Sequence, residues 1–305
     1  MVQSQDGVNR DGKTDLNIVL DEVQYEVLGS PRAQVAMISL NRPELLNPIS
    51  GRPGGTRDQI LHALSLANSD AKIGCVIIRG HGRAFSTGGD LTGNTRRETL
   101  EEHRAFLADA SAFRERMRSS RLPTIAEVHG FCLGAGVLLA ESCDLVIAAQ
   151  SAQFGFPEGR LGLVGISPLT MTIGRQWAKF LMFTGELISA QKAQDLGLVL
   201  AVEADDALHN RVLDLAQRIS RMPREGIALN RQAIDEVADA SGEVLGRLRA
   251  IEVDAQTLLA ADRATAPDGR TFRAIIETDG IPGMKEARSH QYLENWLRPS
   301  DDPGE

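Results

Sequence analysis

The sequence predicts an α/β fold with mostly parallel strands, followed by a helical C-terminal region. Strand-like apolar runs alternate with helix-like segments at intervals of roughly 50 residues, a rhythm typical of α/β folds. Hydrophobic residues make up 42% of the 305 residues and aromatic residues only 4%, so aliphatic side chains must fill most of the core. After Val202 the strand-like runs stop, and amphipathic helical segments follow one another.

Apolar patterns place the elements of the α/β part in order. A turn over 29–31 separates the first two strand-like runs, and Ile60, Leu64 and Ala67 then recur at helical spacing. Pro123 ends a long helix-like segment. We expect strands over 23–28, 34–40, 73–79, 124–128, 145–149 and 152–156, and helices over 57–67, 98–119 and 134–142.

The last third of the chain is expected to be helical. Residues 206–220, 223–238 and 243–261 form three successive amphipathic patterns, and a last helix is expected over 284–296. These segments carry more Leu, Ile and Val than one thin layer needs, which predicts burial against other copies of the chain. The expected organisation is a disordered polar tail over 1–21, an α/β core over 22–203 and a helical oligomerisation region over 204–305.

Charge and cysteine usage narrow the class of protein. The net charge of −8 argues against a nucleic-acid surface, which needs clustered Lys and Arg. Cys75, Cys132 and Cys143 lie in apolar runs without a C-x-x-C pair, as is typical of reduced thiols in a cytoplasmic protein. No signal-peptide core or apolar run of roughly 20 residues is present, so we expect a cytoplasmic protein with no membrane partner.

Two glycine-rich turns and one glutamate form the most informative pattern. The turns cover 84–90 and 129–136, and Glu158 follows in the run Phe-Gly-Phe-Pro-Glu. Glycine lets a backbone approach a ligand closely, and a helix start directs free N–H groups outward. Two such turns can hold one carbonyl oxygen between two N–H donors while a carboxylate moves a proton, which indicates chemistry on an enolate. The alternative is that Glu158 merely starts a helix after Pro157 and interacts with its dipole.

Several other chemistries lack support in the sequence. There is no G-x-G-x-x-G after the first strand, no H-E-x-x-H or Cys/His cluster for zinc, and no G-x-S-x-G nucleophile turn. We therefore expect no metal and no separate cofactor. His129, the only histidine in the second glycine turn, is either structural or catalytic.

The motifs resemble, in the right order, those of the crotonase superfamily, also called the enoyl-CoA hydratase/isomerase family. The resemblance covers residues 23–203, and Ile38–Asn47 is similar to the family's first CoA-contacting segment. The other matching segments are 82–91, 125–130, 133–136, 154–158, 161–163, 183–186 and 193–199.

The resemblance implies a spiral of ββα units, capped by C-terminal helices that form a trimer, often as a dimer of trimers. It implies an acyl-CoA thioester as substrate, with coenzyme A as part of that substrate. By motif position, the backbone N–H groups of Thr87 and Ala135 would hold the thioester oxygen, and Glu158 would move a proton at carbon. Further contacts with the acyl-CoA are expected at Leu45, Ala84, Ser86, Gly88, Asp90, Gly134 and Leu138.

One position departs from the family pattern. Hydratases of this family carry two catalytic glutamates, and Leu138 stands where the first is expected. Glu141 lies about one helical turn further on, rotated by roughly 60° from that face. The leading hypothesis is therefore a lyase or isomerase with Glu158 as its single acid/base, because hydration also needs a positioned water. The alternatives are a hydrolase or C–C lyase of a cyclic or branched acyl-CoA that uses His129 or Glu141, and an acyl-CoA-binding protein with impaired activity.

The stretch after Glu158 also differs from the family pattern. Arg160 and Ser167 lie close to Glu158 in the sequence. They either bind a polar acyl group or are a surface arginine and a turn serine.

Overall fold

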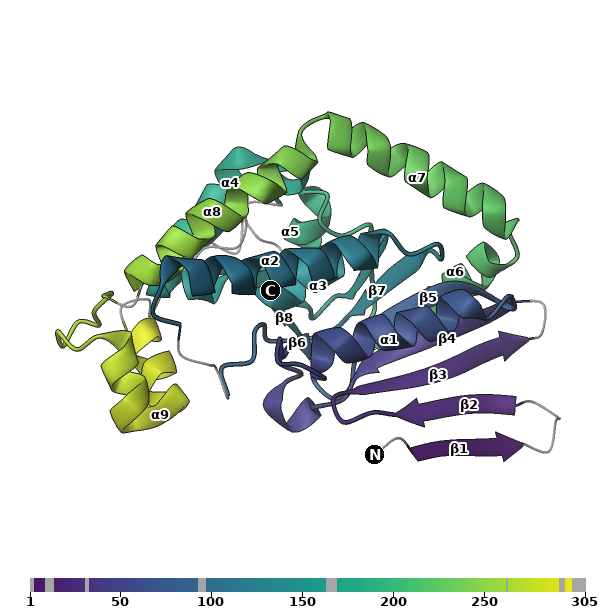
Figure 1. The fold of residues 1–305 in the computed structure, drawn as a ribbon, viewed down its shortest axis with the longest axis horizontal. Helices are drawn as coiled ribbons and strands as arrows, with labels where there is room; N and C mark the ends of the chain where they lie inside the picture. Colours follow the sequence, from purple (N-terminus) through teal and green to yellow (C-terminus); the bar gives the residue numbers. More distant parts are fainter. Residues whose placement is uncertain are drawn as a thin grey trace.

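The computed structural model describes residues 3–8, 14–30, 33–92, 97–162, 169–261, 263–290 and 294–297, with side chains from residue 17 onward. An eight-stranded sheet with the order β1-β2-β3-β4-β5-β7-β9-β12 dominates it (Figure 1). The first four strands pair antiparallel, and β4 to β12 pair in parallel. The strands are β1 (Gln3–Val8), β2 (Thr14–Val19), β3 (Val23–Ser30), β4 (Ala33–Leu40), β5 (Ile73–Gly80), β7 (Thr124–Val128), β9 (Leu145–Ala149) and β12 (Ala201–Glu203).

A second sheet has the order β11-β10-β8-β6 and consists of three-residue strands. In the pairs β5/β6, β7/β8 and β9/β10, the first strand joins the large sheet and the second joins the small one. The chain therefore winds as a spiral, which explains the strand, strand, helix rhythm of the sequence. The strands are β6 (Ala84–Ser86), β8 (Phe131–Leu133), β10 (Gln153–Gly155) and β11 (Leu187–Ser189).

Helices cover both faces of the large sheet, because successive side chains of a strand point to opposite faces. Ile38 and Ile78 enter the main core, whereas Met37 and Ile77 enter a second core that α6 closes. Each fully buried isoleucine side chain stabilises the folded protein by roughly 1.5–3 kcal/mol. The helices are α1 (Thr56–Ser69), α2 (Leu100–Arg118), α3 (Ala135–Glu141), α4 (Thr170–Thr184), α5 (Ala190–Asp195), α6 (Leu208–Ser220), α7 (Arg224–Ala240), α8 (Glu243–Ala261) and α9 (Phe272–Ser289), with 3-10 turns η1 (Pro43–Leu45) and η2 (Pro157–Leu161).

The N-terminal segment differs from the tail expected over 1–21. β1 and β2 form an antiparallel hairpin in which Val8 pairs with Thr14, and β2 continues onto β3. Backbone hydrogen bonds hold such a strand whatever its side chains are, so polar composition did not exclude it. Ile18 also packs on the main core.

Three helices differ from the sequence prediction. The expected helix over 284–296 is instead α9, Phe272–Ser289, and α4 was not predicted. Gly280, at φ 71°, and Pro282 interrupt the helical pattern of α9. Gly174, at φ 76°, does the same in α4. In addition, α6 packs on the large sheet, so the structure makes it part of the core.

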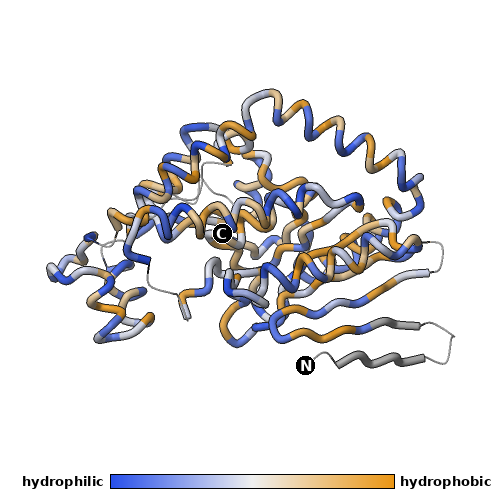
Figure 2. Tube along the Cα trace, in the orientation of Figure 1, coloured by the Kyte–Doolittle hydropathy of each residue, from blue (hydrophilic) through white to orange (hydrophobic). Residues whose placement is uncertain are grey.

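Helices α7 and α8 form an arm: α7 extends away from the sheets, and α8 returns beside α2 (Figure 1). The Arg231 guanidinium ties α7 to the core through the Asp144 carboxylate and the Ser120 carbonyl oxygen. The arm leaves apolar side chains exposed, among them Leu229, Ile234, Val237, Leu245 and Leu248. Figure 2 shows hydrophobic positions along both helices. Within the ranges given above, none of the helices combines the length and apolar character needed to cross a bilayer.

Candidate active site

The two glycine turns meet at one edge of the small sheet. β6 and β8 pair in parallel, with Ser86 opposite Cys132, so the turns that follow these strands lie side by side. A Cβ atom added to Gly88 would lie 3.0 Å from the Leu133 carbonyl oxygen and 3.5 Å from the Ala135 nitrogen. Only glycine lets the first turn approach the second this closely.

Ala135 supplies an N–H group at the junction of the turns. It is the first residue of α3, and Gly134 is the N-cap with φ 52° and ψ −118°. An N–H at the first helical position has no partner within its own helix, and the helix dipole adds positive potential there. This amide is therefore suited to donate to a developing oxyanion.

The N–H of Thr87 differs from the free donor that we expected. It donates to the Leu46 carbonyl oxygen at 3.0 Å. Leu46 and Asn47 hold that carbonyl in place with left-handed φ values of 64° and 55°, which few residues other than glycine adopt. The Asn47 side chain locks this turn, because its Nδ2 donates to the Ala84 carbonyl oxygen at 2.8 Å. A substrate oxygen would have to share or replace the bond between Thr87 and Leu46.

Other residues expected to contact substrate support the turns. Ala84 and Ser86 are fully buried, and the Ser86 hydroxyl donates to the Asn47 carbonyl oxygen at 2.7 Å. Asp90 accepts a hydrogen bond from Arg42 Nη1 at 2.6 Å. Leu45 is 46% exposed on η1 and remains open to a ligand.

The Glu158 carboxylate lies directly against the second turn. A Cβ atom added to Gly134 would lie 2.5 Å from Glu158 Oε1 and 3.1 Å from Oε2. Glu158 does follow a proline in the short turn η2, yet its carboxylate reaches the N-terminus of α3. Burial raises the pKa of Glu158 from 4.5 to about 7, and Arg288 opposes this shift. A carboxyl group with this pKa is part acid and part base at neutral pH.

The structure places three other residues considered for catalysis in different surroundings: Leu138, Glu141 and His129. Leu138 lies one helical turn after Gly134, the residue that the Glu158 carboxylate contacts, and packs on the main core. Burial raises the pKa of Glu141, and the charges that act on it belong to α2 and α8, such as Arg114. His129 Nε2 lies 2.8 Å from the Gly82 carbonyl oxygen, near the start of β6 and β8, whereas the site follows their ends. The structure therefore does not bring Glu141 or His129 to Glu158.

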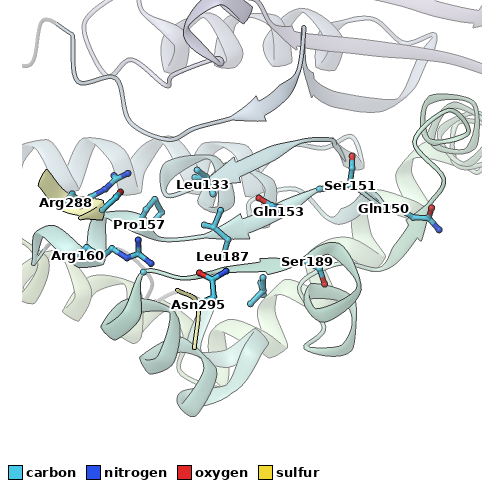
Figure 3. A pocket seen from close by; sticks show the side chains of 14 residues that line it. Leu133, Gln150, Ser151, Gln153, Pro157, Arg160, Leu187, Ser189, Arg288 and Asn295 are labelled. Atoms are coloured by element: carbon cyan, nitrogen blue, oxygen red, sulfur yellow. The ribbon is translucent and has the colours of Figure 1, made fainter. Parts of the chain in front are cut away.

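A cavity of about 520 Å³ has chain neighbours of the site residues in its lining, although Thr87, Ala135 and Glu158 are not in its described lining. Leu133 and Pro157 line it, and they directly precede Gly134 and Glu158 in the chain. Arg160 and Arg288 lie with Pro157 toward one end of the cavity, and Gln150 lies at the other (Figure 3). Arg288 was missed by sequence reasoning because it stands on α9, far along the chain and outside any motif. Ser167 lies outside the described residues.

Two further patterns bear on cofactors. In the described part of the chain, His, Cys, Asp and Glu side chains form no group of three or more that could hold a metal ion. Residues 7–14 read GVNRDGKT, a match to the phosphate-binding pattern G-x-x-x-x-G-K-[ST] that sequence reasoning missed. Val8 ends β1 and Thr14 starts β2 of an antiparallel hairpin, whereas a phosphate-binding loop joins a strand to a helix.

Comparison with known proteins identifies the family of the chain. The Enoyl-CoA hydratase/isomerase family matches residues 31–267. A relative from Mycobacterium bovis, named probable enoyl-CoA hydratase echA8, is 34% identical over 71% of this chain and 84% of its own. The 2,3-dehydroadipyl-CoA hydratase of Escherichia coli is 32% identical over 71% of this chain and 86% of its own.

A solved structure extends the similarity to the fold. An enoyl-CoA hydratase/isomerase from Xanthobacter autotrophicus Py2 superposes with a TM-score of 0.80 at 28% identity, covering 90% of this chain and all of that one. The chain belongs to the enoyl-CoA hydratase/isomerase family, and its fold is the crotonase fold.

Proposed function

We propose that this protein shifts a double bond, or exchanges a proton, next to the thioester of an acyl-CoA, with Glu158 as its only acid/base. The observation that carries the proposal is the Glu158 carboxylate against the N-terminus of α3, with a pKa near 7. The Ala135 N–H would hold the thioester oxygen, and Thr87 would join it on releasing Leu46.

The reaction follows from these positions. Glu158 takes a proton from the carbon next to the thioester, and the electron pair moves into the thioester enolate. For a 3-enoyl-CoA the charge extends over the former double bond. Glu158 then returns the proton two carbons further along the chain, so the product is a 2-enoyl-CoA and nothing else is consumed.

Leu138 separates this reaction from hydration. Its side chain can neither accept a proton nor hold a water, and it follows Gly134, the residue against the Glu158 carboxylate, by one helical turn. Relatives carry the name enoyl-CoA hydratase, but we propose that hydration is slow here. Hydrolysis or C–C cleavage through His129 or Glu141 is disfavoured, because neither lies at Glu158.

The test is turnover of crotonyl-CoA and of a 3-enoyl-CoA by wild type and Glu158→Gln. Isomerisation should be lost in the variant by a factor of about 10²–10⁴, the usual contribution of an acid/base group. Fast hydration that survives Glu158→Gln would reject the single-acid mechanism. Tight binding of acyl-CoA with no turnover of either substrate by wild type would instead support an impaired binding protein.

The exposed apolar side chains of α7 and α8 support a further proposal, that this arm packs against other copies in a trimer or hexamer. Sedimentation of the purified protein measures the assembly. Cys75, Cys132 and Cys143 are buried and unpaired, which supports a reducing, cytoplasmic location.

A further inference from the structure

The 520 Å³ cavity, which Leu133 and Pro157 help to line, has an unusual composition for a site that takes a fatty acyl chain. Most of its residues are polar, and two are arginines, while no residue of the described lining is acidic. A simple alkyl chain would gain little in such a space, because apolar burial drives its binding. The polar lining residues are Gln150, Ser151, Gln153, Arg160, Ser189, Arg288, Ser289 and Asn295.

The two arginines lie close to each other. Arg160 Nε donates to the Thr184 carbonyl oxygen at 2.7 Å, which fixes this guanidinium at the end of α4. Arg288 Nε is buried without a hydrogen-bond partner among the described residues. Burial lowers the pKa of Arg288 and the nearby Arg160 lowers it further, while the Glu158 carboxyl raises it. An anion between the two guanidinium groups would satisfy the buried donor and relieve the repulsion of like charges.

We propose that Arg288 and Arg160 bind a carboxylate at the far end of the acyl chain, so that the substrate is the mono-CoA thioester of a dicarboxylic acid. The inference rests on the proposed function, because it places the thioester at Ala135. Guanidinium groups suit this role, since their planar donors match a carboxylate.

The same arginines would also attract a phosphate of coenzyme A. The position favours the acyl carboxylate. Glu158 acts on carbons next to the thioester, its chain neighbour Pro157 lines the cavity, and the charge of Arg288 acts on the Glu158 carboxyl. The part of the ligand nearest to this wall is therefore the acyl chain.

The experiment compares 3-enoyl-CoA pairs that differ only in the last group, methyl or carboxylate, at chain lengths of about six, eight and ten carbons. The readout is the ratio of kcat/KM for the two members of a pair, in wild type, Arg288→Met and Arg288→Lys. The ratio of kcat/KM values cancels the effect of Arg288 on the Glu158 carboxyl of the free protein, because both substrates meet the same free protein. Arg221→Met, an exposed arginine between α6 and α7 and outside the cavity lining, is the matched control.

We expect wild type to prefer the carboxylate at one length. Arg288→Met should lower that preference about tenfold or more, mainly through KM, and Arg288→Lys should fall between them. The control should keep the wild-type ratio. Calorimetric binding of the saturated pairs and of free CoA gives a readout that needs no turnover, so it separates this inference from the proposed reaction.

Three outcomes would overturn the inference. One is a preference for methyl at every length, in turnover or in binding. Another is an unchanged ratio in Arg288→Met. The third is an equal loss of affinity for both members and for free CoA, which would assign the arginines to a CoA phosphate.

Discussion

Glu158→Gln should stabilise the protein at alkaline pH while it removes activity. Glutamine has nearly the same shape but cannot ionise. In wild type the buried carboxyl group holds its proton more tightly when folded, because burial raises its pKa to about 7. The stability that this group contributes is therefore full below pH 4.5, the ordinary pKa, and is lost as pH rises through about 7.

The size of the effect follows from the two pKa values. Each pKa unit corresponds to about 1.36 kcal/mol, so a rise from 4.5 to about 7 corresponds to roughly 3 kcal/mol between pH 4.5 and pH 8. Glutamine carries no such pH-dependent cost. The free energy of unfolding of Glu158→Gln, relative to that of wild type, should therefore rise by roughly 3 kcal/mol between pH 4.5 and pH 8.

Urea unfolding at pH 5, 6, 7 and 8 measures the effect. The difference between variant and wild type should grow with pH and level off above about pH 7.5. The control is Glu236→Gln, an exposed carboxylate on α7, which should follow wild type. A constant difference between Glu158→Gln and wild type across these pH values would refute the burial argument.

Three other changes test the remaining geometry. Gly134→Ala places a methyl group against the Glu158 carboxylate at a backbone conformation that suits only glycine. The free energy of unfolding should fall by about 1–2 kcal/mol, and kcat/KM should fall about 100-fold. Wild-type kinetics would contradict the contact between Gly134 and Glu158. Leu138→Glu should add hydration of crotonyl-CoA, measured as a loss of absorbance. The negative charge of the new carboxylate should raise the pKa of Glu158 and so move the acid limb of the pH–rate profile to higher pH. An unmoved acid limb would place residue 138 away from Glu158. Arg231→Met removes the bond from α7 to Asp144, and the free energy of unfolding in urea should fall by about 1–3 kcal/mol. An unchanged free energy of unfolding would mean that other contacts hold the arm.

The sequence was most informative where burial is two-sided. β4, β5, β7 and β9 are continuous apolar runs because both faces of the large sheet are covered, and all four were predicted. β6, β8 and β11 were not predicted, because each spans three residues and offers little periodic pattern, whereas the equally short β10 lies within the strand expected over 152–156. β1 and β2 are held by backbone pairing, which composition does not show.

The site also has features that the sequence predicted and features that it did not. Glycine marks close backbone approach, so Gly88 and Gly134 located the two turns. A sequence does not show which carbonyl an amide meets, and the bond from Thr87 to Leu46 was therefore missed. Arg288 reaches Glu158 only through the folding of α9, and an isolated arginine carries no pattern.

The lone carboxylate and its surroundings suit each other. With two acids, each can keep one protonation state, but a single carboxyl must first accept a proton and then return it, which works best at a pKa near the working pH. Burial raises the pKa of Glu158 into that range, and Arg288 opposes the shift. A carboxylate bound at Arg288 would cancel that opposition, so the pKa of Glu158 would rise when the substrate arrives. The site would then gain basicity at the step where proton removal begins, and the acid limb of kcat would lie above that of kcat/KM for a dicarboxylic substrate alone.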